Sequence, residues 1–150
     1  MEMMSKIPFF LLFSSFLFSY NYFGVNGVYS GSISRGIELV GGKKEVNRLY
    51  WKFGMYDYKN NTSLSTLSLN FDIFKKNFYL GCGIGETGNE EKDFFSFNLR
   101  SGYLLKINNK FNLNFDIEEI FIPKKKNIFA VSVGVEKKVD FDMLKLTPYF

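Results

Sequence analysis

Apolar and polar residues alternate one by one along two neighbouring segments, residues 94–107 and 111–122. Successive side chains of a β-strand point to opposite faces, so this period of two is typical of strands with one apolar and one polar face. The apolar face carries Phe95, Phe97, Leu99, Tyr103, Leu105, Ile107, Phe111, Leu113, Phe115 and Ile117. No segment with the helical period competes with this pattern, and the sequence predicts an all-β fold.

Clusters of Asn, Gly and Lys divide the chain into eight strand-like segments. We predict strands at residues 28–40, 49–58, 64–74, 78–85, 94–107, 111–122, 128–136 and 143–150. A chain of 150 residues is expected to form one domain. Eight strands with short connections predict an antiparallel up-and-down β-barrel, and the apolar face would form the outer band of a transmembrane barrel.

The composition favours a membrane-facing exterior. Aromatic residues make up 19% of the chain, more than a soluble domain of this length needs for its core, and aromatic girdles at two bilayer interfaces would use them. The alternation by itself also allows a soluble barrel whose polar face is the solvated exterior. That alternative is a periplasmic, lipocalin-like barrel that binds an apolar ligand inside.

The polar face collects charged side chains and glycines, which can fill a narrow lumen. Its charged residues are Glu38, Lys52, Asp72, Arg100, Asp116, Glu118 and Glu136, and its glycines are Gly81, Gly83, Gly102 and Gly134. Burying charges is costly unless they pair. We therefore predict an internal ion-pair network in which Lys52 and Arg100 bind some of the carboxylates.

The N-terminus predicts an export signal. Lys6 precedes an apolar run at residues 7–20, which suits a signal peptide and is shorter than the roughly 20 residues that a membrane-spanning helix needs. Weak small-residue patterns end at Ser19 and Gly27. We predict a cleavable signal peptide at residues 1–19, or as far as 27, followed by a barrel domain at residues 28–150.

Arg35 conflicts with the predicted outer band, because it shares a face with Ile33 and Ile37. A charge at mid-bilayer would cost roughly 2 to 4 kcal/mol. A bulge at Gly36 would relieve this conflict, and so would a position near the membrane interface where the side chain can snorkel.

The predicted connections have the wrong length pattern. In small membrane barrels the longer loops follow odd-numbered strands. Here the short turns follow the third and fifth predicted strands, while residues 59–63, 86–93 and 123–127 follow even ones. Three explanations are open: loop length is uninformative, the strand count is off by one, or the chain is the front part of a longer barrel.

Two short motifs have a structural explanation. Residues 83–88 match the dinucleotide fingerprint Gly-x-Gly-x-x-Gly, but a strand follows where the motif needs a helix, so we interpret them as lumen glycines that lead into a turn. The basic run at residues 124–126 is interpreted as a solvated turn rather than a contact for phosphate or lipid headgroups.

The chain has no histidine and one cysteine, Cys82. The usual general base of serine and cysteine nucleophiles is therefore missing, and we predict no catalytic site, no metal site and no cofactor. Asp116 and Glu118 share a face, but a structural ion-pair role is favoured over acid–base chemistry. The net charge of +4 is spread along the chain, which gives no nucleic-acid footprint.

The signal-like start, the period-two strands, the Gly-rich inner face and the ending Leu-Lys-Leu-Thr-Pro-Tyr-Phe together resemble the small outer-membrane β-barrel proteins of OmpA, OmpX and opacity-protein type. The resemblance implies a location in the outer membrane, contact with its lipid, and a last strand that the barrel-assembly machinery reads through Leu144, Leu146 and Phe150. Pro148 departs from the commoner ending, since it removes one ladder hydrogen bond.

The resemblance also bears on function. Barrels of this size include enzymes that act on lipid A or phospholipids, and their catalytic sets rely on histidine, which this chain lacks. We therefore predict a non-enzymatic surface or structural protein whose short external loops serve adhesion or envelope integrity. The lipocalin-like carrier and a minor narrow channel are the alternatives, and the loops do not specify an external partner.

Overall fold

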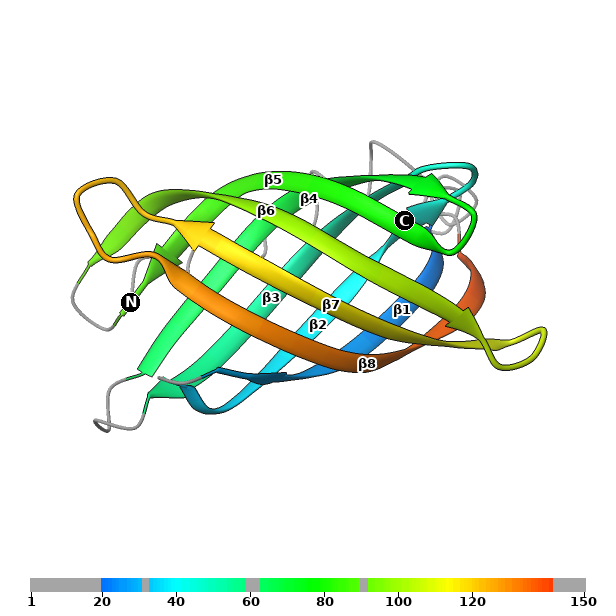
Figure 1. Ribbon diagram of the computed structural model, residues 1–150, viewed down its shortest axis with the longest axis horizontal. Helices are drawn as coiled ribbons and strands as arrows, with labels where there is room; N and C mark the ends of the chain where they lie inside the picture. Colours follow the sequence, from blue (N-terminus) through cyan, green and yellow to red (C-terminus); the bar gives the residue numbers. More distant parts are fainter. Residues whose placement is uncertain (1–19, 31–32, 59–62, 90–91, 142–150) are drawn as a thin grey trace, which may run out of the picture.

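The chain forms a closed barrel of eight antiparallel strands. The computed structural model describes residues 20–30, 33–58, 63–89 and 92–141. The strands are β1 (Tyr20–Tyr29), β2 (Ile33–Lys44), β3 (Arg48–Tyr58), β4 (Ser63–Lys75), β5 (Phe78–Gly88), β6 (Asp93–Lys106), β7 (Phe111–Phe121) and β8 (Ile128–Phe141). Each strand pairs with the next and β8 pairs with β1, so the sheet has no open edge (Figure 1). The predicted all-β, up-and-down barrel is confirmed.

The predicted strand boundaries need correction at both ends of the chain. The segment at residues 28–40 is two strands, since β1 ends at Tyr29 and β2 begins at Ile33, and the barrel starts at Tyr20 rather than at residue 28. Ser30, Gly31 and Ser32, which favour turns, separate the two strands in sequence. The strand predicted at residues 143–150 lies outside the described residues, and β8 continues to Phe141.

The corrected strands restore the expected length pattern of the connections. The connections after odd strands are residues 30–32, 59–62, 89–92 and 122–127, and those after even strands are 45–47, 76–77 and 107–110. The longest connection now follows an odd strand and the shortest an even one, as in small membrane barrels. The strand count is eight, as predicted, so it is not off by one. The assignment is shifted by one strand instead, because residues 28–40 contain the end of β1 and most of β2. We call the two mouths of the barrel the odd-loop end and the even-turn end.

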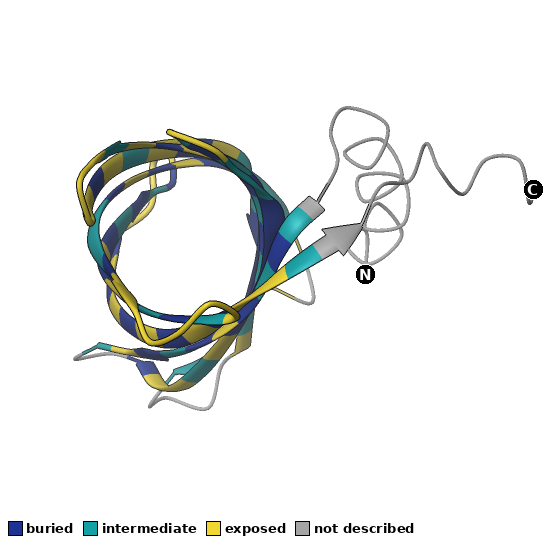
Figure 2. Cartoon of the chain, turned by 90° about the vertical axis from the view of Figure 1, so that its right-hand side faces the viewer, coloured by how far each residue is buried: buried dark blue, intermediate teal, exposed yellow. Residues whose placement is uncertain are grey.

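The apolar face points outward and the polar face inward. Leu99 and Phe115 are 53% and 40% exposed, whereas their neighbours Arg100 and Asp116 are 5% and 4% exposed. The same alternation of buried and exposed residues runs around the wall of the barrel in Figure 2. The predicted outer band is confirmed. The lipocalin-like alternative is wrong, because it requires the large apolar residues to line the interior.

Arg35 avoids the middle of the outer band in two ways. A register shift between Ile33 and Arg35 turns Ile33 into the interior, so the bulge lies just before Gly36 rather than at it. Arg35 itself faces outward near the odd-loop end, where its Nε lies 2.8 Å from Oδ2 of Asp57 and its side chain is 85% exposed. At the rim of the barrel such a charge costs far less than at mid-bilayer.

The interior is apolar near the odd-loop end. A cluster of buried side chains, which we call the apolar plug, fills this part of the lumen. It consists of Val28, Ile33, Tyr56, Ile120, Ile122, Ile128 and Ala130. Tyr58, Leu64 and Phe94 pack against it. Within the described ranges, the chain contains no helix long and apolar enough to cross a membrane.

Candidate functional site

All seven charged residues predicted for the polar face lie inside the barrel. Glu38, Lys52, Asp72, Arg100, Asp116, Glu118 and Glu136 are each 5% exposed or less. An eighth, Arg48, is also buried and was not predicted. Eight buried charges make the interior the most unusual chemical environment of the described chain, since charges leave water only at a large cost in free energy.

Arg48 is the centre of one half of this network. Its Nη2 and Nε lie 2.7 and 2.9 Å from Oδ2 of Asp72, and its Nη1 lies 2.5 Å from Oε1 of Glu136. The rings of Tyr50 and Tyr79 lie 4.8 and 4.7 Å from the guanidinium carbon. Charge-assisted hydrogen bonds and cation–π contacts both gain strength away from water, so this arrangement offsets the cost of burying Arg48.

Lys52 is the centre of the other half. Its Nζ pairs with Oε2 of Glu118 and lies 3.4 Å from Oε2 of Glu38. Glu38 also accepts hydrogen bonds from the Tyr56 hydroxyl at 2.6 Å and from the Asn26 amide at 3.3 Å. The tyrosine joins the ion pairs to the apolar plug, because its ring belongs to that cluster.

Arg100 and Asp116 lie between the two halves. Arg100 Nη2 is 2.9 Å from Oδ2 of Asp72, and its Nη1 is 4.0 Å from Oδ2 of Asp116. Asp116 also accepts hydrogen bonds from Ser132, Asn114 and Tyr79 at 2.5, 3.0 and 3.1 Å. Lys52 and Arg100 thus bind carboxylates inside the barrel, as the predicted network requires.

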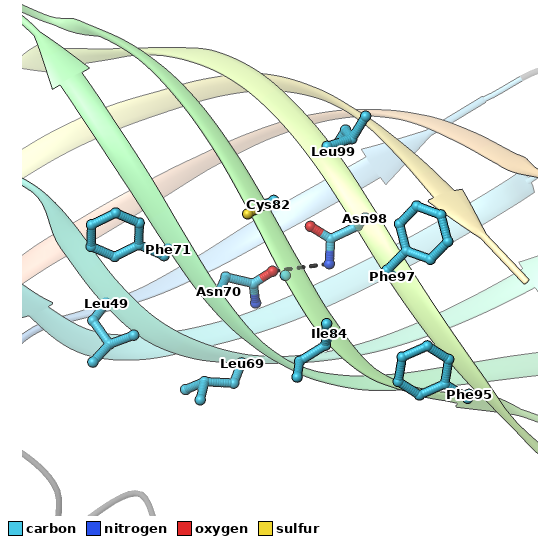
Figure 3. A pocket seen from close by; sticks show the side chains of 11 residues that line it. Leu49, Leu69, Asn70, Phe71, Cys82, Ile84, Phe95, Phe97, Asn98 and Leu99 are labelled. Carbon is cyan, nitrogen blue, oxygen red and sulfur yellow. Dashed lines mark hydrogen bonds between the residues drawn. The ribbon is translucent and has the colours of Figure 1, made fainter.

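Glycines on β5 allow side chains of β4 and β6 to meet across it. Gly81 is paired with Asp72 on one side and Arg100 on the other, and a Cβ at Gly81 would overlap Asp72 Oδ1. Gly83 is likewise paired with Asn70 and Asn98, whose side chains form a 2.9 Å hydrogen bond over it (Figure 3). The fingerprint-like residues 83–88 lie within β5, so no helix follows them as a phosphate site requires.

Arg48 escaped prediction because the expected strand began one residue later, at Leu49. The signal was present: Arg48, Tyr50 and Lys52 follow one another at a spacing of two, so they share a face. The inward tyrosines Tyr50, Tyr56 and Tyr79 were missed for another reason. Aromatic residues were assigned to the outer band by type, whereas strand position places these three inside.

The outer wall has an apolar groove of about 530 Å³, across β3 to β6. Leu49, Leu69, Phe71, Cys82, Ile84, Phe95, Phe97 and Leu99 line it, and Figure 3 shows these side chains around β5. Cys82 is exposed there. The described residues hold no group of three or more Cys, Asp or Glu side chains placed to bind a metal ion. Leu144, Leu146 and Phe150, expected to be read during assembly, lie outside the described residues.

Solved structures share this architecture. The crystal structure of Neisserial surface protein A (NspA) matches with a TM-score of 0.61 at 13% identity, over 81% of this chain and 97% of that chain. The N-terminal β-barrel domain of Pseudomonas aeruginosa OprF matches with a TM-score of 0.58 at 12% identity, over 81% of this chain and 100% of that chain. The Yersinia pestis outer membrane protein Ail, in a phospholipid bilayer nanodisc, matches with a TM-score of 0.56 at 8% identity, over 81% of this chain and 100% of that chain.

No family model and no curated protein matches the chain. At these low identities the likeness to solved structures concerns the fold. It confirms the resemblance expected from the sequence at that level: the chain has the eight-stranded β-barrel fold of these small outer-membrane proteins.

Proposed function

We propose that this chain is a non-enzymatic barrel of the outer membrane, which holds the loops of its odd-loop end at the cell surface. The observation that carries this proposal is the inversion of the usual arrangement: large apolar residues cover the outside, and eight charged residues lie buried in the interior. In water such an exterior would be one continuous aggregation-prone surface. In a bilayer the same exterior faces lipid, and the strands satisfy their backbone groups through a closed ladder.

The first test is the gel mobility of the outer-membrane fraction with and without boiling. A folded barrel that resists detergent migrates differently from its heated, unfolded form. We expect the chain to co-purify with the outer membrane and to shift on boiling. A soluble periplasmic chain without a shift would contradict the proposal.

Replacing Phe115 by lysine is expected to block insertion into lipid. Phe115 lies on the outward face of β7 and is paired with Tyr103 and Val133, so no carboxylate is opposite to it. A lysine at the bilayer midplane costs about 2 to 4 kcal/mol. We expect most of the variant to remain in the slow-migrating, unfolded form when it is refolded into phosphatidylcholine vesicles.

The matched control is Ile107→Lys. Ile107 is also exposed, at 52%, but it lies beyond the end of β6 in an even-turn connection. A lysine near the interface costs only about 0 to 1 kcal/mol. Equal insertion of both lysine variants would show that the band around Phe115 does not face lipid.

A third prediction concerns the narrow-channel alternative. The apolar plug and the ion-paired side chains occupy the lumen at successive levels, so we expect no resolved current steps from the purified barrel in planar bilayers. A general porin measured in the same bilayers is the positive control. Reproducible steps whose size rises with salt concentration would favour the channel instead.

Two parts of the proposal concern residues outside the described ranges. We propose that the barrel-assembly machinery reads the chain through Leu144, Leu146 and Phe150, as the resemblance implies. We also propose that signal cleavage occurs after Ser19. Cleavage after Gly27 would remove most of β1, which begins at Tyr20 and pairs with both β2 and β8.

A further inference from the structure

The odd-loop end contains a concave site of about 770 Å³ above the apolar plug, which we call the mouth site. Its lining comes from β3, β4, β6, β8 and the connections after β5 and β7. The lining residues are Tyr58, Leu64, Asn89, Lys92, Phe94, Ile122, Pro123, Lys124, Lys125, Lys126 and Ile128. Because residues from most of the barrel circumference contribute, the site lies at the mouth of the barrel and not on its lipid-facing wall.

The floor of the mouth site is apolar and aromatic. Ile122 and Ile128 belong to the apolar plug, and Tyr58, Leu64 and Phe94 pack against it. These side chains are fixed from below, so the floor is a preformed surface for a flat apolar group. A preformed site loses little conformational entropy on binding.

Four lysines surround this floor. The Nζ atoms of Lys92 and Lys125 lie 5.3 and 5.1 Å from the centre of the Phe94 ring, so cations from two different connections converge on one aromatic side chain. Among the described residues, none of the four lysines takes part in an ion pair. Two nearby carboxylates have other partners: Asp57 pairs with Arg35, and Glu119 accepts a hydrogen bond from Asn127 at 3.2 Å.

The backbone of the connection after β7 supports the same interpretation. Lys125 N donates a 3.0 Å hydrogen bond to Ile122 O, which closes a turn with Pro123 and Lys124 in the middle. Lys124 has a φ of 63°, a conformation for which such turns usually have Gly or Asn. Lys124 adopts this conformation at a cost, and its side chain lines the mouth site.

We propose that the mouth site binds a soluble organic anion that carries an aromatic or other flat ring and two or more sulfate, sulfonate or phosphate groups. The ring would lie on the floor at Phe94, and the acidic groups would pair with the ammonium groups of the lysines. The ammonium groups of lysines held close together repel one another, and a multivalent anion bound between them relieves this repulsion. The inference deepens the proposed function, since it names the kind of ligand that the surface-facing end would take.

The experiment is a calorimetric titration of the folded barrel with naphthalene-1,3,6-trisulfonate in a zwitterionic detergent. This probe has a flat ring and three anionic groups, and its charge keeps it out of the micelle interior. We expect saturable binding to the unmodified chain, at least about 10-fold tighter than that of inorganic sulfate, because sulfate lacks the ring. Equal affinity for sulfate would overturn the proposed ligand class without any variant.

Two triple variants that remove the same number of positive charges distinguish binding at the mouth site from general electrostatic attraction to the barrel. The triple variant Lys124→Gln, Lys125→Gln, Lys126→Gln is expected to weaken binding by about 10-fold or more, and Phe94→Ala by several-fold. The matched triple variant Lys75→Gln, Lys76→Gln, Lys110→Gln, in the even-turn connections and at their edge, is expected to change the affinity by less than about 2-fold. Similar losses in both triple variants would overturn the proposal in favour of bulk electrostatics.

The lipid is a competing source of anionic groups, and a second titration tests it. The barrel is placed in phosphatidylcholine nanodiscs with and without phosphatidylglycerol. We expect little change in probe affinity, because the mouth site opens along the barrel axis. Strong competition by the anionic lipid would assign the lysines to headgroups and overturn the soluble ligand. A barrel that shifts on boiling yet fails to bind the probe would refute this inference and leave the proposed function intact.

Discussion

Replacing Arg48 by methionine is expected to destabilise the folded barrel by about 3 to 5 kcal/mol, the usual cost of removing one partner from a buried ion pair. Methionine keeps much of the length of the side chain but removes the hydrogen bonds that Arg48 donates to Asp72 and Glu136. The negative charges of these two carboxylates would then lose the positive charge of Arg48 in a site from which water is excluded. The free energy of unfolding is measured by urea titration in detergent, followed by gel mobility and by the fluorescence of Trp51.

Arg35→Met is the matched control, because Arg35 also pairs with an aspartate but is largely exposed. Exposed ion pairs contribute about 0 to 1 kcal/mol, so this variant is expected to fold almost as well as the unmodified chain. The double variant Arg48→Met, Glu136→Gln should recover part of the loss, since it removes one of the unpaired charges. If Arg48→Met were no worse than Arg35→Met, the interior ion pairs would not stabilise the barrel.

The second large effect is expected from Gly81→Val. The new side chain would overlap Asp72 Oδ1, and its Cβ would lie 2.8 Å from the backbone oxygen of Phe71, which cannot move away without breaking the ladder. It would also stand between Asp72 and Arg100, which now meet over Gly81 at 2.9 Å. Overpacking alone costs about 1 to 3 kcal/mol, and separation of the ion pair adds to it. We expect a low yield of the fast-migrating form on refolding into vesicles.

Cys82→Val is the control for this substitution. Cys82 is the next residue of the same strand, but it faces outward and is exposed in the groove of Figure 3. A valine there meets lipid, so the yield of folded barrel should be close to that of the unmodified chain. If Gly81→Val folded as well as Cys82→Val, side chains from β4 and β6 would not need the space that β5 leaves between them.

Alternation alone was enough to identify the face on which each of the seven predicted interior charges lies. Glu38, Asp72 and Glu136 come from β2, β4 and β8, far apart in sequence, yet a spacing of two relative to apolar neighbours put each on the polar face, and each is buried. The reason is physical: a strand has two faces, so one well-identified apolar neighbour determines the direction of the next side chain. The fold class and the inward position of these carboxylates follow from this local information.

Pairing partners could not be predicted in the same way. Arg48 and Glu136 are 88 residues apart, and they meet only because β8 closes onto β1 and brings its interior face towards β3. Closure depends on the stagger between strands, which no local pattern records. The first strand was missed for a related reason. Its inward residues include Gly24 and Asn26, which read locally as a turn and become strand residues only through pairing with β2 and β8.

The glycines of β5 have a consequence for how the barrel finds its register. Gly81 leaves space for the Asp72–Arg100 pair, while Gly102 of β6 leaves space for the ring of Tyr79. A slip of β5 by two residues in one direction would insert the Tyr79 ring between Asp72 and Arg100. A slip in the other direction would move that ring opposite Leu104 and away from Gly102. The large side chains and the glycines thus fit together in a single register. Hairpins in another register would be destabilised by contacts inside the lumen, independently of their turns and of the surrounding lipid.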